Sequence, residues 1–177
     1  MAVSSQRPTP HLILGGARSG KSRYAEALVT SLPPPYVYIA TAEVLDEEMR
    51  QRVLAHQERR KESWETVETA LDLLPTLESL QGRAKPVLVD CLTLWLTNLL
   101  LRASGSPPED AVEKLCGFLR IADYPLFLVS NEVGAGIVPE NALARRFRDL
   151  AGAANQKVAH SCRAATLLVA GLPVVLK

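Results

Sequence analysis

One stretch of this chain decides its fold: Gly15-Gly16-Ala17-Arg18-Ser19-Gly20-Lys21-Ser22, which fits the pattern G-x-x-x-x-G-K-[ST] of a phosphate-binding loop. The apolar residues 11–14 before it predict a short buried strand, and residues 22–30 after it have the apolar spacing of a helix. A strand, a glycine-rich loop and a helix in this order are the context in which such a loop binds phosphate. The sequence therefore predicts a nucleotide-phosphate site rather than a chance glycine-rich turn.

The residue types in this loop indicate how it would hold a nucleotide. Glycines allow backbone N–H groups to turn inward around a phosphate, and the N-terminus of the following helix adds partial positive charge. Lys21 can reach the β- and γ-phosphates, and the hydroxyl of Ser22 can ligate Mg²⁺. The motif alone does not say which reaction the phosphate undergoes.

The composition bounds the class of protein. A chain of 177 residues can form one domain with a real core but not two ordinary ones, and a hydrophobic content of 47% argues against disorder. The formal net charge of +1 gives no global field that would attract nucleic acid or a membrane. The widely spaced Cys91, Cys116 and Cys162 form neither a C-x-x-C pair nor a metal pattern, which favours a reducing cytoplasm.

Two segments bear on targeting and domain organisation. Residues 1–10 are polar and contain proline, so we expect a flexible tail rather than a signal peptide, followed by a single catalytic domain over residues 11–177. The longest apolar run, around residues 92–101, is too short to span a bilayer.

The apolar pattern predicts an α/β fold. Expected strands are continuous apolar runs, which is typical of a parallel sheet covered on both faces, and helical patterns alternate with them. Near the end, Gly171-Leu172-Pro173 separates two apolar runs and predicts a closing antiparallel hairpin. Strands are expected at 11–14, 36–40, 86–89, 126–130 and 165–170, and helices at 22–30, 44–61, 92–101, 108–121 and 140–162.

Polar residues follow several of the expected strands, at the edge where ligands bind in such sheets. Thr41-Ala42-Glu43 follows the second expected strand, and Asn131-Glu132 follows the fourth. Asp90 follows the third, where an acidic residue of a phosphate-loop enzyme helps to hold Mg²⁺, although a helix N-cap is the simpler alternative. Glu68, four residues after Trp64, could bind a base or a ribose hydroxyl, or have no function.

His56 lies in the expected helix 44–61, within about 20° of the apolar Leu45 on a helical wheel. This position alone would suit a core histidine. Arg52, Arg59 and Arg60 share its side of the helix, however, and positive charge disfavours a protonated imidazole. A neutral imidazole has a lone pair that can attack phosphorus. A core histidine, a solvated charged helix and a polyphosphate site with a nucleophile all remain open from spacing.

Longer motifs are more specific than the phosphate-binding loop. The loop is followed by Tyr38-Ile39-Ala40-Thr41-Ala42 and Leu45-Asp46-Glu47-Glu48-Met49, and His56 stands eight residues before Trp64. The longest motif begins with Ser130-Asn131-Glu132-Val133-Gly134-Ala135-Gly136-Ile137-Val138-Pro139-Glu140-Asn141 and runs on through residues 144–152 and 155–156. Through these motifs, residues 11–177 resemble the bifunctional adenosylcobinamide kinase / adenosylcobinamide-phosphate guanylyltransferase family of cobalamin biosynthesis.

The resemblance implies a three-layer P-loop NTPase fold with a RecA-like, mostly parallel sheet and two reactions. One phosphorylates the aminopropanol hydroxyl of adenosylcobinamide with ATP or GTP. The other transfers GMP from GTP to that phosphate and releases pyrophosphate, through a histidine that carries GMP covalently. The resemblance also implies Mg²⁺ as cofactor, no nucleic-acid partner and a cytoplasmic homotrimer.

The resemblance implies site residues position by position. The catalytic positions are His56, as the guanylylated histidine, and Lys21, and the metal positions are Ser22 and Asp90. The nucleotide-binding positions are Gly15, Gly16, Ala17, Arg18, Ser19, Gly20, Lys21, Ser22, Thr41, Ala42, Glu43, His56, Gln57, Glu58, Arg59, Glu68 and Asp90.

The chain departs from the family pattern at a few positions without losing a needed functional group. Ala55 stands where some relatives have a second histidine, Lys61 where a proline is common, and Asp90 where some have glutamate. Two other functions fit the sequence: a small-molecule kinase without nucleotidyl transfer, and a non-catalytic regulatory module that binds nucleotide.

Overall fold

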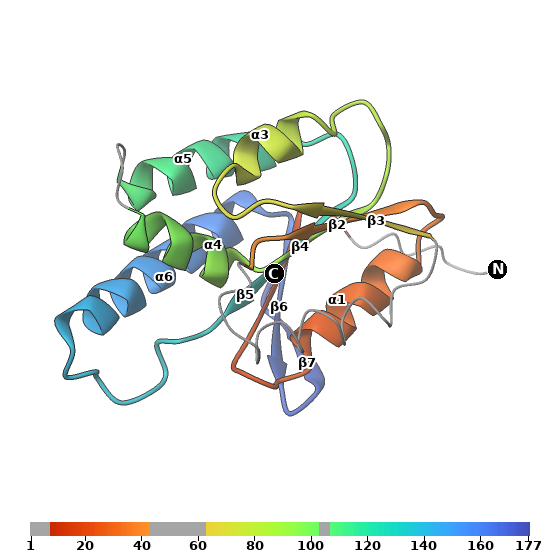
Figure 1. The fold of residues 1–177 in the computed structure, drawn as a ribbon. Helices are drawn as coiled ribbons and strands as arrows, with labels where there is room; N and C mark the ends of the chain where they lie inside the picture. The colour runs from red at the N-terminus through yellow and green to blue at the C-terminus, as the bar shows by residue number, and fades with distance from the viewer. Residues whose placement is uncertain (1–7, 43–62, 103–106) are drawn as a thin grey trace.

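The computed structural model describes residues 8–42, 63–102 and 107–177. In these residues one sheet of seven strands, in the order β3-β2-β4-β5-β1-β6-β7, has helices on both faces (Figure 1). The strands are β1 (His11–Gly15), β2 (Tyr36–Ala40), β3 (Trp64–Glu68), β4 (Val87–Asp90), β5 (Leu126–Asn131), β6 (Ala164–Val169) and β7 (Leu172–Val175). The helices are α1 (Lys21–Thr30), α3 (Leu73–Glu78), α4 (Leu92–Leu101), α5 (Pro108–Leu119) and α6 (Ala142–Ser161).

The sheet is parallel except at one edge, as the sequence predicts. Strands β1 to β6 pair in parallel, and β7 pairs antiparallel with β6. The β6–β7 turn consists of Ala170 and Gly171, whose φ angles of 52° and 80° are both positive. Two central residues with positive φ make the type I′ turn whose twist matches that of a two-residue hairpin. The expected closing hairpin is therefore confirmed.

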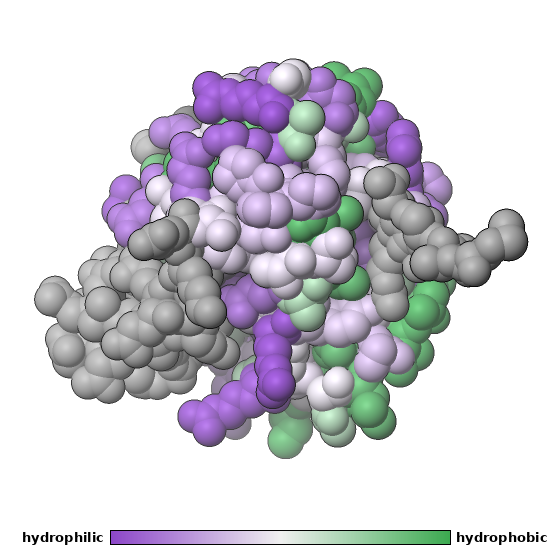
Figure 2. All heavy atoms as spheres, turned by 90° about the vertical axis from the view of Figure 1, so that its right-hand side faces the viewer, coloured by the Kyte–Doolittle hydropathy of each residue, from purple (hydrophilic) through white to green (hydrophobic). Residues whose placement is uncertain are grey.

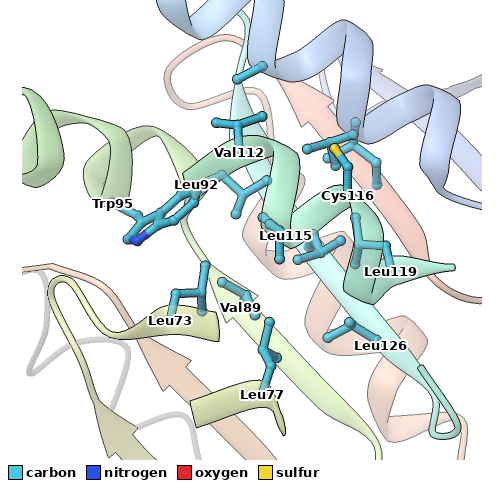
Figure 3. Packing of buried hydrophobic residues seen from close by; sticks show 14 of the residues in the cluster. Leu73, Leu77, Val89, Leu92, Trp95, Val112, Leu115, Cys116, Leu119 and Leu126 are labelled. Carbon is cyan, nitrogen blue, oxygen red and sulfur yellow. The ribbon is translucent and has the colours of Figure 1, made fainter. Parts of the chain in front are cut away.

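Side chains from the two faces of the sheet form two separate cores. Ile13, Leu88 and Val129 point toward α1 and pack with its buried Ala25 and Val29. The other face packs against α3, α4, α5 and α6, and Figure 3 shows part of this second core, including Val89, Leu115 and Leu126. Strands buried on both faces explain why their sequences are apolar without alternation.

Two elements lie where the sequence predicts none. Strand β3 is an edge strand with the sequence WETVE, and only Trp64 and Val67 are partly buried. Trp64 packs on Tyr36 of β2, with ring centroids 4.9 Å apart. Helix α3 has six residues, too few for a helical period to show in the sequence. The expected helix 44–61 lies outside the described residues, and no helix that the structure describes is long and apolar enough to cross a bilayer.

The loop between β1 and α1 is held by the C-terminal hairpin. A Cβ atom on Gly15 would lie 2.4 Å from Ser19 Oγ and 2.9 Å from the carbonyl oxygen of Leu168 on β6. The backbone N–H of Gly171 donates to the carbonyl oxygen of Ser19 at 3.0 Å. The first glycine of the loop is therefore required by close packing, and the loop rests on a hairpin about 150 residues later in the chain.

Replacing Gly15 by alanine is expected to lower the free energy of unfolding by about 1–3 kcal/mol, because the fixed Leu168 carbonyl leaves no space for the methyl group. Gly16→Ala is the matched control, since no atom lies within 4 Å of its added Cβ. That control should stay within about 0.5 kcal/mol of the wild type. Denaturant unfolding measures both, and equal stabilities of the two variants would contradict the packing argument.

The three cysteines are unpaired and buried, with exposed fractions of 6% for Cys91 and 2% for both Cys116 and Cys162. Burial raises the pKa of Cys91 and of Cys162 to about 12, and it raises the pKa of Cys116 as well. At pH 8 all three are therefore protonated thiols rather than the reactive thiolates. We expect an aromatic disulfide reagent to react with no cysteine of the native protein within minutes. After unfolding in guanidinium it should react with three cysteines per chain. Rapid release from the native protein would contradict this packing.

Candidate functional site

The carboxyl ends of four parallel strands meet at one edge of the sheet. Ala40 at the end of β2 is paired with Asp90 at the end of β4, and Asp90 with Val129 of β5. Asn131 at the end of β5 is paired with Gly15 at the end of β1. The phosphate-binding loop and the acidic Asp90 are therefore brought to the same edge, on strands that are separated only by β5.

The loop is formed by short-range backbone bonds and by unusual backbone angles. The N–H of Ser19 donates to the carbonyl oxygen of Gly16 at 3.2 Å, and Gly20 has a φ of 93°, a conformation that favours glycine. Gly16, Ala17 and Arg18 are exposed. The hydroxyl oxygen of Ser19 is buried without a hydrogen-bond partner among the described residues. An unpartnered buried hydroxyl in a loop at a helix N-terminus suits a site that a phosphate completes.

Lys21 is the first residue of α1 and is half-buried. Its Nζ donates to the carbonyl oxygen of Gly16 at 3.0 Å, across the loop that it would share with a phosphate. Burial lowers the pKa of the Lys21 ammonium below its ordinary value, and Cys91 and Asp90 oppose that effect. The Asp90 carboxylate therefore favours the charged form of Lys21.

Asp90 lies on the α1 face of the sheet, because the alternate residue Leu88 packs in the core on that face. Helix α4 begins after Asp90, with Cys91 as its N-cap and no side-chain cap bond. The N-cap alternative for Asp90 is therefore wrong. The carboxylate is half-buried at the edge of the sheet, and its oxygens are of the hard type that Mg²⁺ prefers.

Thr41 holds the turn that follows Asp90. Its side chain is fully buried, and its hydroxyl donates to the carbonyl oxygen of Cys91 at 2.7 Å and accepts the N–H of Cys91 at 2.9 Å. Asn98 of α4 donates to the carbonyl oxygen of Thr41 at 2.9 Å. The hydroxyl of Thr41 is thus engaged with the protein backbone, and the half-buried Ala42 follows at the edge of the sheet.

The two glutamates of β3 lie at opposite ends of that strand. Glu68 is exposed at its carboxyl end, where it is paired with Ala40 of β2. Glu65 is near the other end and accepts a bond from Lys85 at 3.0 Å. Of these two glutamates, only Glu68 therefore lies at the edge of the sheet where the carboxyl ends of the strands meet. The sequence-predicted Glu43, His56, Gln57, Glu58 and Arg59 lie outside the described residues.

A buried polar network surrounds the end of β5, and sequence reasoning selected none of its members as site residues. Ser130 donates to Asn155 Oδ1 at 2.7 Å, and Asn155 donates to the carbonyl oxygen of Asn131 at 3.0 Å. The N–H of Asn131 donates to Thr93 Oγ1 at 2.7 Å. The polar pair Asn131-Glu132 at a strand end was the signal available in the sequence, whereas the partners on α4 and α6 become visible only in the fold.

Solved structures of other proteins share this architecture. An ATPase from the type III secretion system of pathogenic bacteria aligns with a TM-score of 0.56 at 14% identity, covering 93% of this chain and 56% of its own. A Pyrococcus horikoshii protein aligns with a TM-score of 0.53 at 10% identity, covering 94% of this chain and 85% of its own. At these identities the likeness shows the fold alone, and it agrees with the expected α/β architecture with a mostly parallel sheet.

Sequence relatives are much closer. The bifunctional adenosylcobalamin biosynthesis protein CobP of Pseudomonas aeruginosa is 47% identical over 166 residues, which cover 94% of this chain and 96% of the relative. The corresponding CobU protein of Salmonella typhimurium is 41% identical over 181 residues, covering 94% and 98%. A family model for cobinamide kinase / cobinamide phosphate guanyltransferase matches residues 11–176. The chain belongs to the cobinamide kinase / cobinamide phosphate guanyltransferase family.

Proposed function

We propose that this chain phosphorylates the aminopropanol hydroxyl of adenosylcobinamide with ATP or GTP, and then transfers GMP from GTP to the new phosphate. The products of the second reaction are adenosylcobinamide-GDP and pyrophosphate. The observation that carries the proposal is the phosphate-binding loop with Lys21 and Asp90 at one sheet edge, in a chain of this family. A single P-loop domain over residues 11–177 would carry out both reactions.

The loop is proposed to hold the polyphosphate. Its backbone N–H groups, the Lys21 ammonium and the buried Ser19 hydroxyl are donors, and phosphate oxygens are their natural acceptors. Lys21 leaves the carbonyl oxygen of Gly16 to bind the β- and γ-phosphates. Thr41 supports this site by fixing the turn after Asp90, while Ala42, Glu43, Gln57, Glu58, Arg59 and Glu68 are proposed to contact the rest of the nucleotide.

Mg²⁺ is proposed to bind the hydroxyl of Ser22 and the carboxylate of Asp90. Both groups are hard oxygen ligands, and Ser22 and Asp90 are half-buried. The described residues hold no group of three or more His, Cys, Asp or Glu side chains that would form an all-protein metal cage. A site with one carboxylate suits a cation that also binds phosphate and water. When bound, Mg²⁺ neutralises phosphate charge.

His56 is proposed as the nucleophile of guanylyl transfer. An imidazole nitrogen forms a bond to the α-phosphorus of GTP, while the bond from that phosphorus to the bridging oxygen breaks and pyrophosphate leaves. A phosphate oxygen of adenosylcobinamide phosphate then attacks the same phosphorus, and the phosphorus–nitrogen bond breaks. The arginines that the sequence places around His56 favour the neutral imidazole that this first step needs.

The proposal predicts a covalent label. Protein incubated with GTP labelled at the α-phosphate and Mg²⁺ should become labelled, and the bond should be labile in acid and stable in base, as a phosphoramidate is. His56→Ala should abolish the label, because no other imidazole stands in the expected helix 44–61. His160→Ala is the matched control, since His160 is exposed in the last turn of α6, and its label should match the wild type.

The outcomes separate the alternatives. A label that survives His56→Ala would exclude His56 as nucleophile. Phosphorylation of cobinamide without any label would favour a kinase that lacks nucleotidyl transfer, and neither activity would favour a regulatory module. Asp90→Asn should reduce label formation at low Mg²⁺ concentration, and an unchanged Mg²⁺ dependence would contradict the metal site.

A homotrimer is proposed for the solution state. The β6–β7 hairpin exposes large apolar side chains, with exposed fractions of 69% for Leu172 and for Val175. Figure 2 shows apolar residues in green in the lower part of the face that it draws. Apolar surface of this kind is typical of contacts between subunits.

We also propose that the protein is located in the cytoplasm. Its buried free thiols suit that reducing compartment, and cell fractionation would test the location.

Light scattering coupled to size exclusion is expected to give three times the chain mass of 19.3 kDa. Leu172→Lys should shift the species toward the single-chain mass, because burying an unpaired ammonium at an interface is unfavourable. Lys177→Ala serves as a control for a change of charge at the same end of the chain. A wild-type protein that elutes at the single-chain mass would contradict the trimer.

A further inference from the structure

We propose that the side-chain amide of Asn131 binds the outermost phosphate of the nucleoside triphosphate and thereby distinguishes GTP from GDP. The inference rests on the proposed function, because it takes the loop between β1 and α1 as the triphosphate site. It adds a residue at the end of β5 to that site, on the side of the loop where β4 lies.

The register of the sheet places Asn131 between the loop and Asp90. Strand β5 lies between β1 and β4, and Asn131 is paired directly with Gly15, the first loop residue. Side chains alternate along a strand, and Phe127 and Val129 of β5 pack in the core on the α1 face. Asn131 therefore lies on the α1 face, which is also the face of Asp90.

The backbone of Asn131 is held from two helices on the opposite face. Its N–H donates to Thr93 Oγ1 on α4 at 2.7 Å, and its carbonyl oxygen accepts from Asn155 Nδ2 on α6 at 3.0 Å. Ser130 Oγ donates to Asn155 Oδ1 at 2.7 Å and lies 3.3 Å from Thr93 Oγ1. Polar groups are costly to bury unless they are hydrogen bonded, and these three side chains satisfy one another while they hold the backbone of Asn131 on both sides of its Cα.

The side chain of Asn131 is left available by this arrangement. It is half-buried, and its carboxamide makes no hydrogen bond to any residue that the structure describes. A carboxamide carries two N–H donors and no charge. The next residue, Glu132, is the other polar group at this strand end, but its Oε1 accepts the N–H of Gly134 at 2.6 Å and its negative charge would repel phosphate.

The position of Asn131 indicates which phosphate it meets. A phosphate-binding loop surrounds the inner phosphates, and its lysine reaches the outer ones. Asn131 lies beside the loop on the Asp90 side, toward the metal ligand that also contacts the outer phosphates. A fixed neutral donor there strengthens binding of a third phosphate, and it contacts the group that the kinase step transfers.

The test compares two nucleotides in one protein background. His56→Ala prevents covalent capture, and calorimetry with Mg²⁺ then measures Kd for GDP and for the β,γ-imido analogue of GTP. Adding Asn131→Ala should raise Kd for the GTP analogue about tenfold, because a hydrogen bond to a charged group contributes on that scale. Kd for GDP should change less than about twofold, since GDP has no third phosphate.

Two further variants control the comparison. Asn141→Ala removes an exposed amide that caps α6 by accepting the N–H of Ala144, and it should leave both Kd values unchanged. Asn131→Asp keeps the shape of the side chain, so it remains informative if Asn131→Ala does not fold. Its negative charge should weaken the GTP analogue more than alanine does. Equal changes for both nucleotides, or none, would overturn the inference.

Failure of this inference and failure of the proposed function are distinguishable. Unchanged Kd values in Asn131→Ala, together with a normal covalent label in wild-type protein, would remove only the role of Asn131. A selective loss of the GTP analogue in Asn131→Ala, without any label or transfer activity in wild-type protein, would leave Asn131 as a phosphate ligand and overturn the enzyme function.

Discussion

The close approach of Gly15 to β6 is the constraint on which the nucleotide site depends. The carbonyl oxygen of Leu168 and the side chain of Ser19 occupy the space that any side chain at position 15 would need. The loop consequently turns directly at the end of β1, at the edge of the sheet where β4 and β5 also end. Lys21 at the start of α1 and Asp90 at the end of β4 are thereby placed at the same edge, where burial lowers the pKa of Lys21 and the Asp90 charge opposes that effect.

Much of the fold could be predicted because its strands are buried on both faces. The continuous apolar runs at β1, β2, β4, β5 and β6 predict strands within one or two residues of the observed bounds, and α4 matches its expected range. Strand β3 could not be predicted in this way because it lies at the edge of the sheet with one side open. Its exposed Glu65, Thr66 and Glu68 leave no continuous apolar run around the packed Trp64. The apolar pattern of a segment reflects how many of its side chains are buried, and an exposed edge strand buries few of them.

Only part of the candidate site could be predicted from the sequence. The loop and Asp90 could be predicted from residue type and place, because phosphate and Mg²⁺ need particular groups at strand ends. The role of Thr41 in holding the turn after Asp90 could not be predicted, because its hydroxyl binds the backbone of Cys91, 50 residues away in the chain. The hydrogen bonds of Asn131 likewise depend on Thr93 and Asn155, which only the packing of α4 and α6 brings to the same residue.

The contact between the β6–β7 hairpin and the phosphate-binding loop also orders events during synthesis. Gly171 and Leu168 support a loop that begins at Gly15, so a segment is completed by another that is synthesised about 150 residues later. A nascent chain that has made β1, α1, β4 and β5 still lacks the neighbour on the other side of β1. We therefore expect nucleotide to stabilise this protein most strongly once β6 and β7 have joined the sheet and support the loop.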